Sequence, residues 1–260
     1  LVLAQIGSVR ADLEHGAGRR DLQVLLPSGA ARNALDTALW DLESRQAGVP
    51  VDARLGQPPL ENMVSALTLS LDTPEKMAAA AAAVATAPLI KLKVDAWSPT
   101  ERIRAVRQSA PLARLIVDPN ESWDMALLRD MQPILVENDV ALVEQPLPAD
   151  DDQALEGFTP ARPICADESC HVAADLPRLR GRYQAVNIKL DKTGGLTGAL
   201  QLLEAAQADG FLVMVGCMVG SSLGIAPALH VARHAAFVDL DGPWWLKEDM
   251  PGGVQFQQGH

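Results

Sequence analysis

The stretch APLIKLKVDAW, residues 87–97, places two lysines inside an apolar β-strand pattern. Whether this strand lies at the edge of a sheet or is buried decides how the fold is interpreted. Side chains alternate between the two faces of a strand, so Lys91 and Lys93 point to the same side. One explanation is an edge strand whose lysines block unwanted pairing. The other is a polar site on a buried strand, and the rest of the chain distinguishes between the two.

Eight strand-like apolar runs alternate with helical stretches from Met63 onward. The runs are MVSALTLSL, LIKLKV, RLIVD, VALVEQ, PICAD, QAVNIKL, FLVMVG and AFVDL. The stretches between them, such as PTERIRAVRQSA and LTGALQLLEAAQADG, have the length and pattern of crossover helices. This alternation predicts an α/β fold with a parallel TIM-like barrel. Residues 28–45 are predicted to form a further helix outside the repeat, capped by Ser28.

The composition excludes several classes of function. A hydrophobic content of 48% with 21% charged residues is typical of a globular protein, and no apolar run is long enough to span a bilayer. The net charge of -11 argues against nucleic acid, and no basic amphipathic helix suits a membrane surface. Three cysteines without CxxC spacing favour a reducing compartment. We therefore expect a cytoplasmic protein with a small-molecule partner, and leave a homo-oligomer open.

Ionisable residues recur at the carboxyl ends of the predicted strands, where such barrels carry their functional groups. These residues are Lys91, Lys93, Asp118, Glu144, Asp167, Lys189, Asp239 and Asp241. From Lys93 the successive intervals are 25, 26, 23 and 22 residues, which is one strand–helix unit each time. Because isolated buried charges are expensive, this recurrence favours a common site. A ring of mutually paired salt bridges is the structural alternative.

Three of these carboxylates follow adjacent strands: Asp118, Glu144 and Asp167. Their mutual repulsion would favour a hard divalent cation. No Cys or His stands among them, which argues against zinc. The sequence therefore predicts a Mg²⁺ site, with Mn²⁺ as the alternative.

The two lysines on opposite strands suggest the reaction. In a closed ring of eight, strands 2 and 6 face each other, so Lys93 lies opposite Lys189. A metal-held substrate carboxylate would have its α-carbon between two amines, as removal of a proton from one face and its return to the other require. We also expect Lys91 and the cation to lower the pKa of Lys93, so that it can act as a base.

The string FVDLDGP sets Asp239 and Asp241 on one face of strand 8, across from strand 4. This pair would attract a cation. A substrate that reaches both ends of the site would carry a carboxylate at one end and an ammonium at the other, which fits a dipeptide. The alternative is a strand end and tight turn with solvated carboxylates.

Seven strings, in order along the barrel, resemble the dipeptide epimerases of the L-Ala-D/L-Glu type in the enolase superfamily. They are KLKVD, LIVDPNESW, LVEQPLP, PICADESCH, VNIKLDKTGG, GCM and DLDGPWWL. The resemblance implies a (β/α)7β barrel capped by an α+β domain. We expect residues 1–57 to be the helical remainder of that cap, 58–245 the barrel, and 246–260 a segment returning to the cap. The cap sheet and its specificity loops are expected to lie outside this chain.

The resemblance also implies catalytic roles. Lys93 and Lys189 match the two bases, and Lys91 matches a partner lysine. The matched Mg²⁺ ligands are Asp118, Glu144 and Asp167. The pairing of lysine bases with Mg²⁺ is already documented for this superfamily.

The implied substrate contacts are Asp239 and Asp241, which hold the amino group, and Cys217, which touches the dipeptide. The implied reaction is conversion of L-Ala-D-Glu to L-Ala-L-Glu by 1,1-proton transfer through an enediolate, in murein peptide recycling. One alternative is a related cycloisomerase or o-succinylbenzoate synthase, which needs no ammonium-binding pair. Another is a catalytically silent dipeptide-binding protein.

Two weaker motifs carry no function in this interpretation. In KTGG, Gly194 and Gly195 are expected to form the turn after strand 6, and Lys192 to be solvated. His230 and His234 lie four apart on a predicted helix, but no third ligand is near in sequence, so we predict no metal there.

Overall fold

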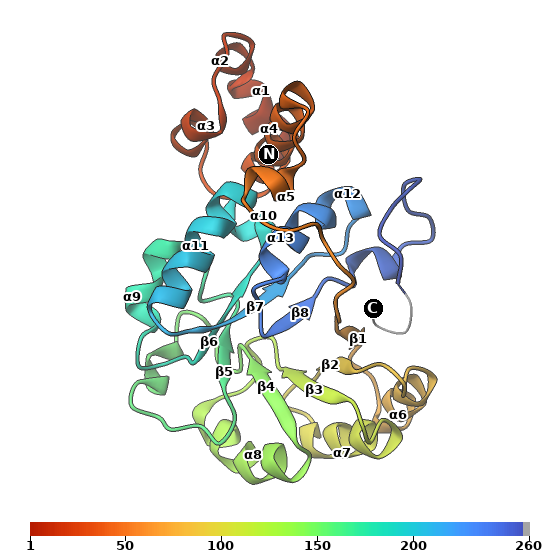
Figure 1. Cartoon of the computed structure of the whole chain (residues 1–260). Helices are drawn as coiled ribbons and strands as arrows, with labels where there is room; N and C mark the ends of the chain where they lie inside the picture. The colour runs from red at the N-terminus through yellow and green to blue at the C-terminus, as the bar shows by residue number, and fades with distance from the viewer. Residues whose placement is uncertain (257–260) are drawn as a thin grey trace.

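The computed structural model describes residues 1–256 and contains one eight-stranded parallel sheet that curls into a barrel (Figure 1). Strand order follows chain order, and each strand pairs in parallel with the next. The strands are β1 Leu67–Leu69, β2 Leu89–Lys93, β3 Arg114–Asp118, β4 Val140–Glu144, β5 Ile164–Ala166, β6 Ala185–Ile188, β7 Leu212–Gly216 and β8 Phe237–Asp239. All eight predicted strands are present, so the predicted fold class is confirmed.

Hydrogen bonds next to the paired strands bring β8 beside β1. The Ala66 N–H donates to Val238 O at 2.7 Å, and the Leu240 N–H donates to Ser65 Oγ at 2.8 Å. The ring order therefore places β2 and β6 opposite each other, with three strands between them on either side. Since β2 pairs with both β1 and β3, the edge-strand explanation of its two lysines is wrong.

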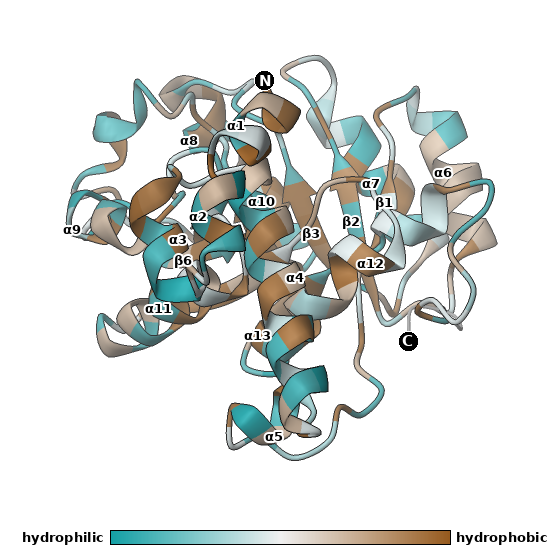
Figure 2. Cartoon of the chain, turned by 90° about the horizontal axis from the view of Figure 1, so that it is seen from above, coloured by the Kyte–Doolittle hydropathy of each residue, from teal (hydrophilic) through white to brown (hydrophobic). Residues whose placement is uncertain are grey.

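Helices surround the sheet, as the crossover pattern predicts. They are α6 Pro74–Ala83, α7 Pro99–Ser109, α8 Met125–Glu137, α9 Leu176–Leu179, α10 Leu190–Thr193, α11 Leu196–Ala208, α12 Ser222–Ile225 and α13 Leu229–Ala232. Short 3-10 turns add η1 Asp152–Leu155, η2 Ala173–Asp175, η3 Ala226–Ala228 and η4 Gly242–Trp245. The side chain of Asp124 begins α8 by accepting from the Leu127 N–H at 2.8 Å. Figure 2 shows that these helices mix hydrophobic and hydrophilic residues, as helices with one buried face do.

Five further helices precede the barrel, and one of them, α4 Ala30–Ala47, packs against α10 and α11 (Figure 1). They are α1 Val2–Ser8, α2 Arg10–Glu14, α3 Arg19–Leu25, α4 Ala30–Ala47 and α5 Val51–Arg54. The predicted helix is α4, but its predicted cap is wrong. Gly29, with φ of 141°, occupies the N-cap position, and no side chain there makes a capping hydrogen bond. Glycine suits this left-handed backbone because it lacks a Cβ.

Helix α4 is tied to the barrel by two polar contacts. Asp36 accepts from the Thr197 N–H in the first turn of α11 at 2.9 Å, and Arg32 donates to Thr193 O at 2.8 Å. A Cβ on Gly195 would lie 2.5 Å from the Asp36 side chain, so only glycine allows this approach. The KTGG turn therefore also serves as the docking point of α4.

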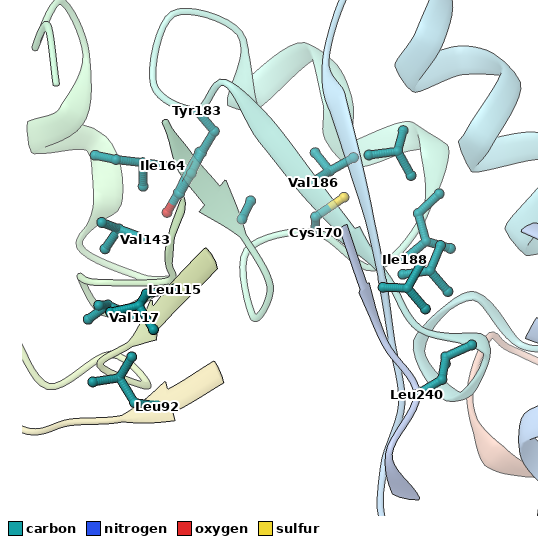
Figure 3. Close-up of a cluster of buried hydrophobic side chains, with 14 of the residues drawn as sticks. Leu92, Leu115, Val117, Val143, Ile164, Cys170, Tyr183, Val186, Ile188 and Leu240 are labelled. Carbon is teal, nitrogen blue, oxygen red and sulfur yellow. The ribbon is translucent and has the colours of Figure 1, made fainter. Parts of the chain in front are cut away.

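The apolar core has two parts. One lies between the strands and the helices and includes Leu92, Leu115 and Val117 (Figure 3). The other fills the barrel with one residue from each strand or from just before it: Ala66, Leu89, Ile116, Leu142, Cys165, Ala185, Met214 and Phe237. We call this second set the interior apolar layer.

None of the helices in residues 1–256 is long and apolar enough to cross a membrane. Of the predicted C-terminal segment 246–260, residues 257–260 lie outside the described residues.

Candidate active site

A second set of residues lies two positions after each member of the interior apolar layer. Because alternate residues of a strand share a face, this set also faces the barrel interior, nearer the carboxyl ends of the strands. Its members are Thr68, Lys91, Asp118, Glu144, Asp167, Asn187, Gly216 and Asp239. We call it the site layer. Lys93, Lys189 and Asp241 follow two positions further along their own strands.

Lys91 lies at the centre of the site layer. Its Nζ is 3.0 Å from Asp118 Oδ2, 2.7 Å from Glu144 Oε2 and 2.9 Å from Asp239 Oδ2. Burial alone would lower the pKa of Lys91, but the carboxylates of Asp239, Glu144 and Asp118 outweigh burial and raise it well above the ordinary value. Its charge is thus compensated by three carboxylates, so Lys91 repels Lys93 less than the sequence suggested.

Lys93 lies at the mouth of the site and is held by two acceptors. Its Nζ donates to Asp118 Oδ2 at 2.6 Å and to Asn120 Oδ1 at 2.7 Å. Asn120 in turn donates to Glu168 Oε1 at 3.4 Å. Asn120 has φ of 44°, the left-handed region that asparagine tolerates better than most residues. This turn after β3 brings its amide oxygen to Lys93.

Lys189 is held on the other side of the site by Asp167. Its Nζ lies 2.5 Å from Asp167 Oδ2. Burial opposes the charged form, yet Asp167 and Glu144 raise the pKa of Lys189 above its ordinary value. On β7, a Cβ on Gly216 would lie 2.8 Å from the Asn187 amide and 3.1 Å from Lys189 Cε. The glycine therefore makes room for both side chains.

The predicted solvation of Lys192 is wrong. We expected this residue to be solvated, but its Nζ donates to Asp167 Oδ1 and to Asp167 O, both at 2.6 Å, and to Asn187 O at 2.9 Å. The short helix α10 turns the side chain back beneath Lys189, where it fixes Asp167. Burial would raise the pKa of Asp167, but Lys192 and Lys189 hold it well below its usual range.

Glu144 has an oxygen with no hydrogen-bond partner. Oε1 accepts from Asn187 Nδ2 at 2.8 Å. Oε2 is buried and accepts no hydrogen bond from the described residues, although Lys91 Nζ lies 2.7 Å away. Burial and the neighbouring Asp118 raise the pKa of Glu144 to about 8. Oε2 therefore forms an ion pair with Lys91 but accepts no hydrogen bond within residues 1–256.

The three predicted metal ligands line one wall, from the ends of β3, β4 and β5. Among residues 1–256, no three Asp, Glu, His or Cys side chains are arranged to hold a metal ion, because Lys91 lies between Asp118 and Glu144. The chemistry of the set still fits a hard cation: all donors are carboxylate oxygens, and Glu144 Oε2 has no hydrogen bond.

Ion pairs join four lysines to four carboxylates in two separate groups, so the ring of salt bridges named as the structural alternative is present only in part among the described residues. One group contains Lys91, Lys93, Asp118, Glu144 and Asp239, and the other contains Lys189, Lys192 and Asp167. Asp241 lies outside both groups. No cation of the described residues lies within ion-pair distance of Asp241, and it is only 6% exposed.

The carboxyl end of β8 holds the two predicted aspartates on one face. Asp239 accepts from Thr68 Oγ1 at 3.3 Å as well as from Lys91. Asp241 accepts from the Thr68 N–H at 2.8 Å and from Trp245 Nε1 at 3.1 Å. Both aspartates are buried, so the alternative of solvated turn carboxylates is wrong.

These side chains open into a cavity of about 290 Å³ at the carboxyl ends of the strands. It is lined by Thr68, Lys91, Lys93, Asn120, Glu168, Lys189, Cys217, Met218, Val219, Asp239, Asp241, Gly242 and Trp245. Burial, followed by the charge of Asp239, raises the pKa of the Cys217 thiol to about 12. The thiol is therefore neutral at ordinary pH. The cavity brings together every predicted base and substrate contact, while the three predicted metal ligands lie beneath it.

A network around Gln145, which sequence reasoning did not predict, positions the loops after β4 and β5. Gln145 has φ of 34°, a strained conformation that costs about 1–3 kcal/mol. Its Oε1 accepts from the Asp167 and Ser169 N–H groups at 2.8 and 3.1 Å, and its Nε2 donates to Tyr183 Oη at 3.0 Å. These bonds fix the backbone beside Glu144 and Asp167.

Sequence reasoning also missed Thr68, Asn187, Asn120 and Glu168. Strand alternation would have identified the first two, because Thr68 follows Ala66 by two residues and Asn187 precedes Lys189 by two. Asn120 and Glu168 lie in loops, where no periodic signal applies.

Comparison with protein families identifies both parts of the chain. Residues 76–260 match the family described as "Enolase C-terminal domain-like". Residues 1–56 match the family described as "Mandelate racemase / muconate lactonizing enzyme, N-terminal domain".

Two relatives share about half of their aligned residues with this chain. The L-Ala-D/L-Glu epimerase of Escherichia coli (strain K12) is 48% identical over 260 residues, which covers 99% of this chain and 81% of that protein. The N-acetyl-D-glutamate racemase of a Pseudoalteromonas species is 50% identical over 234 residues, which covers 90% of this chain and 74% of that protein.

Two solved structures are also similar to this chain over nearly all of its length. An enolase family member from Agrobacterium tumefaciens, described as homologous to dipeptide epimerases and bound to sodium and L-Ala-L-Glu, has a TM-score of 0.96 and 46% identity, covering 99% of this chain and 79% of its own. A dipeptide epimerase from Enterococcus faecalis, complexed with Mg and L-Leu-L-Tyr, has a TM-score of 0.88 and 27% identity, covering 98% and 77%. The chain belongs to the mandelate racemase/muconate lactonizing enzyme family of the enolase superfamily.

Proposed function

We propose that this chain epimerises dipeptides by moving the α-hydrogen of the carboxyl-terminal residue, with L-Ala-D/L-Glu as the substrate. One observation carries the proposal: two lysines from opposite strands and a buried aspartate without a cationic partner line the same cavity. The relatives that bind or epimerise such dipeptides support the assignment.

The proposed cofactor is Mg²⁺, held by Asp118, Glu144 and Asp167. When bound, it would stabilise the negative charge that develops on the substrate carboxylate as the α-hydrogen leaves. Support comes from the all-oxygen donor set, from Glu144 Oε2, which accepts no hydrogen bond from the described residues, and from the Enterococcus structure described with Mg.

Lys93 and Lys189 are the proposed acid and base. Each amine tip is fixed by a carboxylate, Asp118 for Lys93 and Asp167 for Lys189. In either direction one lysine must be neutral to accept the α-proton, and the other must be charged to return a proton to the opposite face. The raised pKa of Lys189 favours its charged form, which suits the direction in which Lys189 returns the proton.

Asp241 is the proposed site for the ammonium of the amino-terminal residue. A buried carboxylate pays a desolvation cost that an incoming ammonium offsets. Asp239 already faces Lys91 at 2.9 Å, so its charge is partly used, and Asp241 has the larger unsatisfied negative charge. Cys217 lies beside it in the cavity as a neutral contact.

The proposed domain division places the cap remainder at 1–57, the barrel at 58–245 and the returning segment at 246–260. Arg233 supports the first boundary, because it holds the connecting segment by donating to Pro58 O at 2.7 Å and to Pro59 O at 3.2 Å.

A second candidate is racemisation of N-acylated glutamate, which the Pseudoalteromonas relative favours. An acetyl group is shorter than an alanyl group by one carbon and lacks its ammonium. The two substrates therefore share the reacting centre and differ at the end that Asp241 would recognise.

Deuterium exchange tests both candidates in the full-length protein with Mg²⁺. L-Ala-L-Glu and N-acetyl-L-glutamate are incubated separately in D₂O, and α-hydrogen loss is followed by NMR. We expect faster exchange and full epimerisation of the dipeptide. A preference for N-acetyl-L-glutamate would favour the second candidate, and no exchange in either substrate would reject catalysis on both.

A further inference from the structure

Two adjacent tryptophans follow the β8 aspartates and have the same exposure but different contacts. Trp244 and Trp245 are each 48% exposed. Trp245 lines the active-site cavity and donates from Nε1 to Asp241 Oδ2 at 3.1 Å. Trp244 packs edge-on against Phe256, with ring centroids 6.2 Å apart, and does not line the cavity. Only Trp245 is coupled to the site.

The donors to Asp241 are arranged on one side of its carboxylate. Oδ2 accepts from the Thr68 N–H at 2.8 Å and from Trp245 Nε1 at 3.1 Å. Oδ1 accepts no hydrogen bond from the described residues. Two donors on one oxygen fix the plane of the carboxylate and leave the other oxygen as the acceptor for a ligand.

The backbone next to Asp241 is closely packed. A Cβ on the adjacent Gly242 would lie 2.8 Å from Met218 O and 3.2 Å from Cys217 Sγ, so the backbone after Asp241 is packed directly against the β7 loop. The backbone is therefore fixed, and the remaining freedom is rotation of the carboxylate itself. Among the side chains around Asp241, the indole of Trp245 is the donor that restricts this rotation.

We propose that Trp245 is a positioning residue that aims Asp241 at the ammonium of the substrate, and thereby sets the preference for free dipeptides over N-acylated amino acids. This inference rests on the proposed function and names one determinant of its specificity. The indole ring also forms part of the cavity wall that Asp241 lines.

The substitution Trp245→Phe separates these two contributions, because it keeps an aromatic wall and removes only the N–H donor. A charge-assisted hydrogen bond has an effect of about tenfold on binding, so we expect KM for L-Ala-L-Glu to rise about fivefold to tenfold with little change in kcat. KM for N-acetyl-L-glutamate should stay the same, since that substrate has no ammonium. Trp244→Phe is the matched control and should change neither substrate's kinetics.

Three results would overturn the inference: unchanged kinetics in Trp245→Phe, an equal loss in Trp244→Phe, or an equal loss for the N-acyl substrate. A measurement without turnover keeps the inference testable if the proposed function itself fails. In ¹⁵N-labelled full-length protein, the indole signal absent from Trp245→Phe should shift in Asp241→Asn, and the signal absent from Trp244→Phe should not. An unshifted Trp245 signal would reject the contact whatever the enzyme's activity.

Discussion

The interior apolar layer and the site layer occupy the same eight strands, two residues apart, and have opposite chemistry. Ile116 and Asp118 of β3 are both fully buried, as are Cys165 and, within 1%, Asp167 after β5. The same strands thus bury an apolar layer and a charged layer. The two layers are about 6–7 Å apart along the strands, which is the rise over two residues. Burial alone does not distinguish the core from the site.

What distinguishes the layers is how each is stabilised. The interior apolar layer is stabilised by burial of apolar surface and by close packing. The free energy of unfolding lost on substitution therefore depends on the side-chain volume that is removed. The site layer depends on mutual pairing of charges, so loss of one member leaves its partners unpaired in a buried place. A change in either layer should therefore produce a different kind of defect.

The largest expected effect is loss of catalysis at the upper edge of the site layer. Lys93→Ala and Lys189→Ala should each reduce interconversion of L-Ala-D-Glu and L-Ala-L-Glu by about 10²–10⁴-fold, because one face of the α-carbon then lacks its acid or base. Deuterium exchange should survive from one stereoisomer only. Chiral chromatography and NMR measure the two rates.

The control for this pair is Lys76→Ala on α6, whose side chain is 71% exposed and pairs with Asp72. It should leave both rates unchanged. Interconversion at the normal rate in either of the two site variants would show that the assignment of the bases is wrong.

Removal of the central cation should destabilise the fold itself. Lys91→Met leaves Asp118, Glu144 and Asp239 without their shared ammonium, and we expect a loss of about 3–5 kcal/mol in the free energy of unfolding when divalent ions are chelated. Urea unfolding with EDTA measures it. The control, Leu92→Met, changes the next residue on the opposite face of β2 and should cost less than about 1.5 kcal/mol. Equal losses in the two variants would show that the shared ammonium of Lys91 is not what stabilises the site layer.

Substitutions in the interior apolar layer should lower stability without changing substrate binding. Ile116→Ala is expected to cost about 2–5 kcal/mol of unfolding free energy and to leave KM for the dipeptide unchanged, because its side chain touches the layer and not the cavity. Ile116→Val should cost only about 0.5–1.5 kcal/mol. A change in KM with little loss of stability would mean that the two layers are not separable.

Sequence alternation predicted the strands and most of the site layer because both follow from a period of two. Charged members such as Lys91 and Asp118 are conspicuous in an apolar strand, whereas Thr68 and Asn187 are ordinary in one and were missed. The position of Lys192 depends on how α10 turns after β6, which no periodicity encodes. The left-handed backbone at Gln145 is likewise decided by the tertiary hydrogen bonds that it receives.

The smallest expected effect is a pH dependence of substrate binding. Burial, followed by the charge of Asp239, raises the pKa of Asp241 above its ordinary value. An acid with a raised pKa is charged above that pKa and neutral below it, so the attraction for an ammonium is lost as pH falls. We expect KM for L-Ala-L-Glu to rise about two- to fivefold from pH 7 to pH 5.

N-acetyl-L-glutamate separates this effect from other titrations in the site, because it carries the same carboxylates and lacks the ammonium. Its KM should change less over the same pH range. In Asp241→Asn the side chain is neutral at every pH, so KM for the dipeptide should be high throughout and lose the difference between the two substrates. If instead both substrates follow the same pH profile in the wild-type protein, the ammonium is recognised elsewhere, and Asp241 belongs with the structural pairs of the site layer.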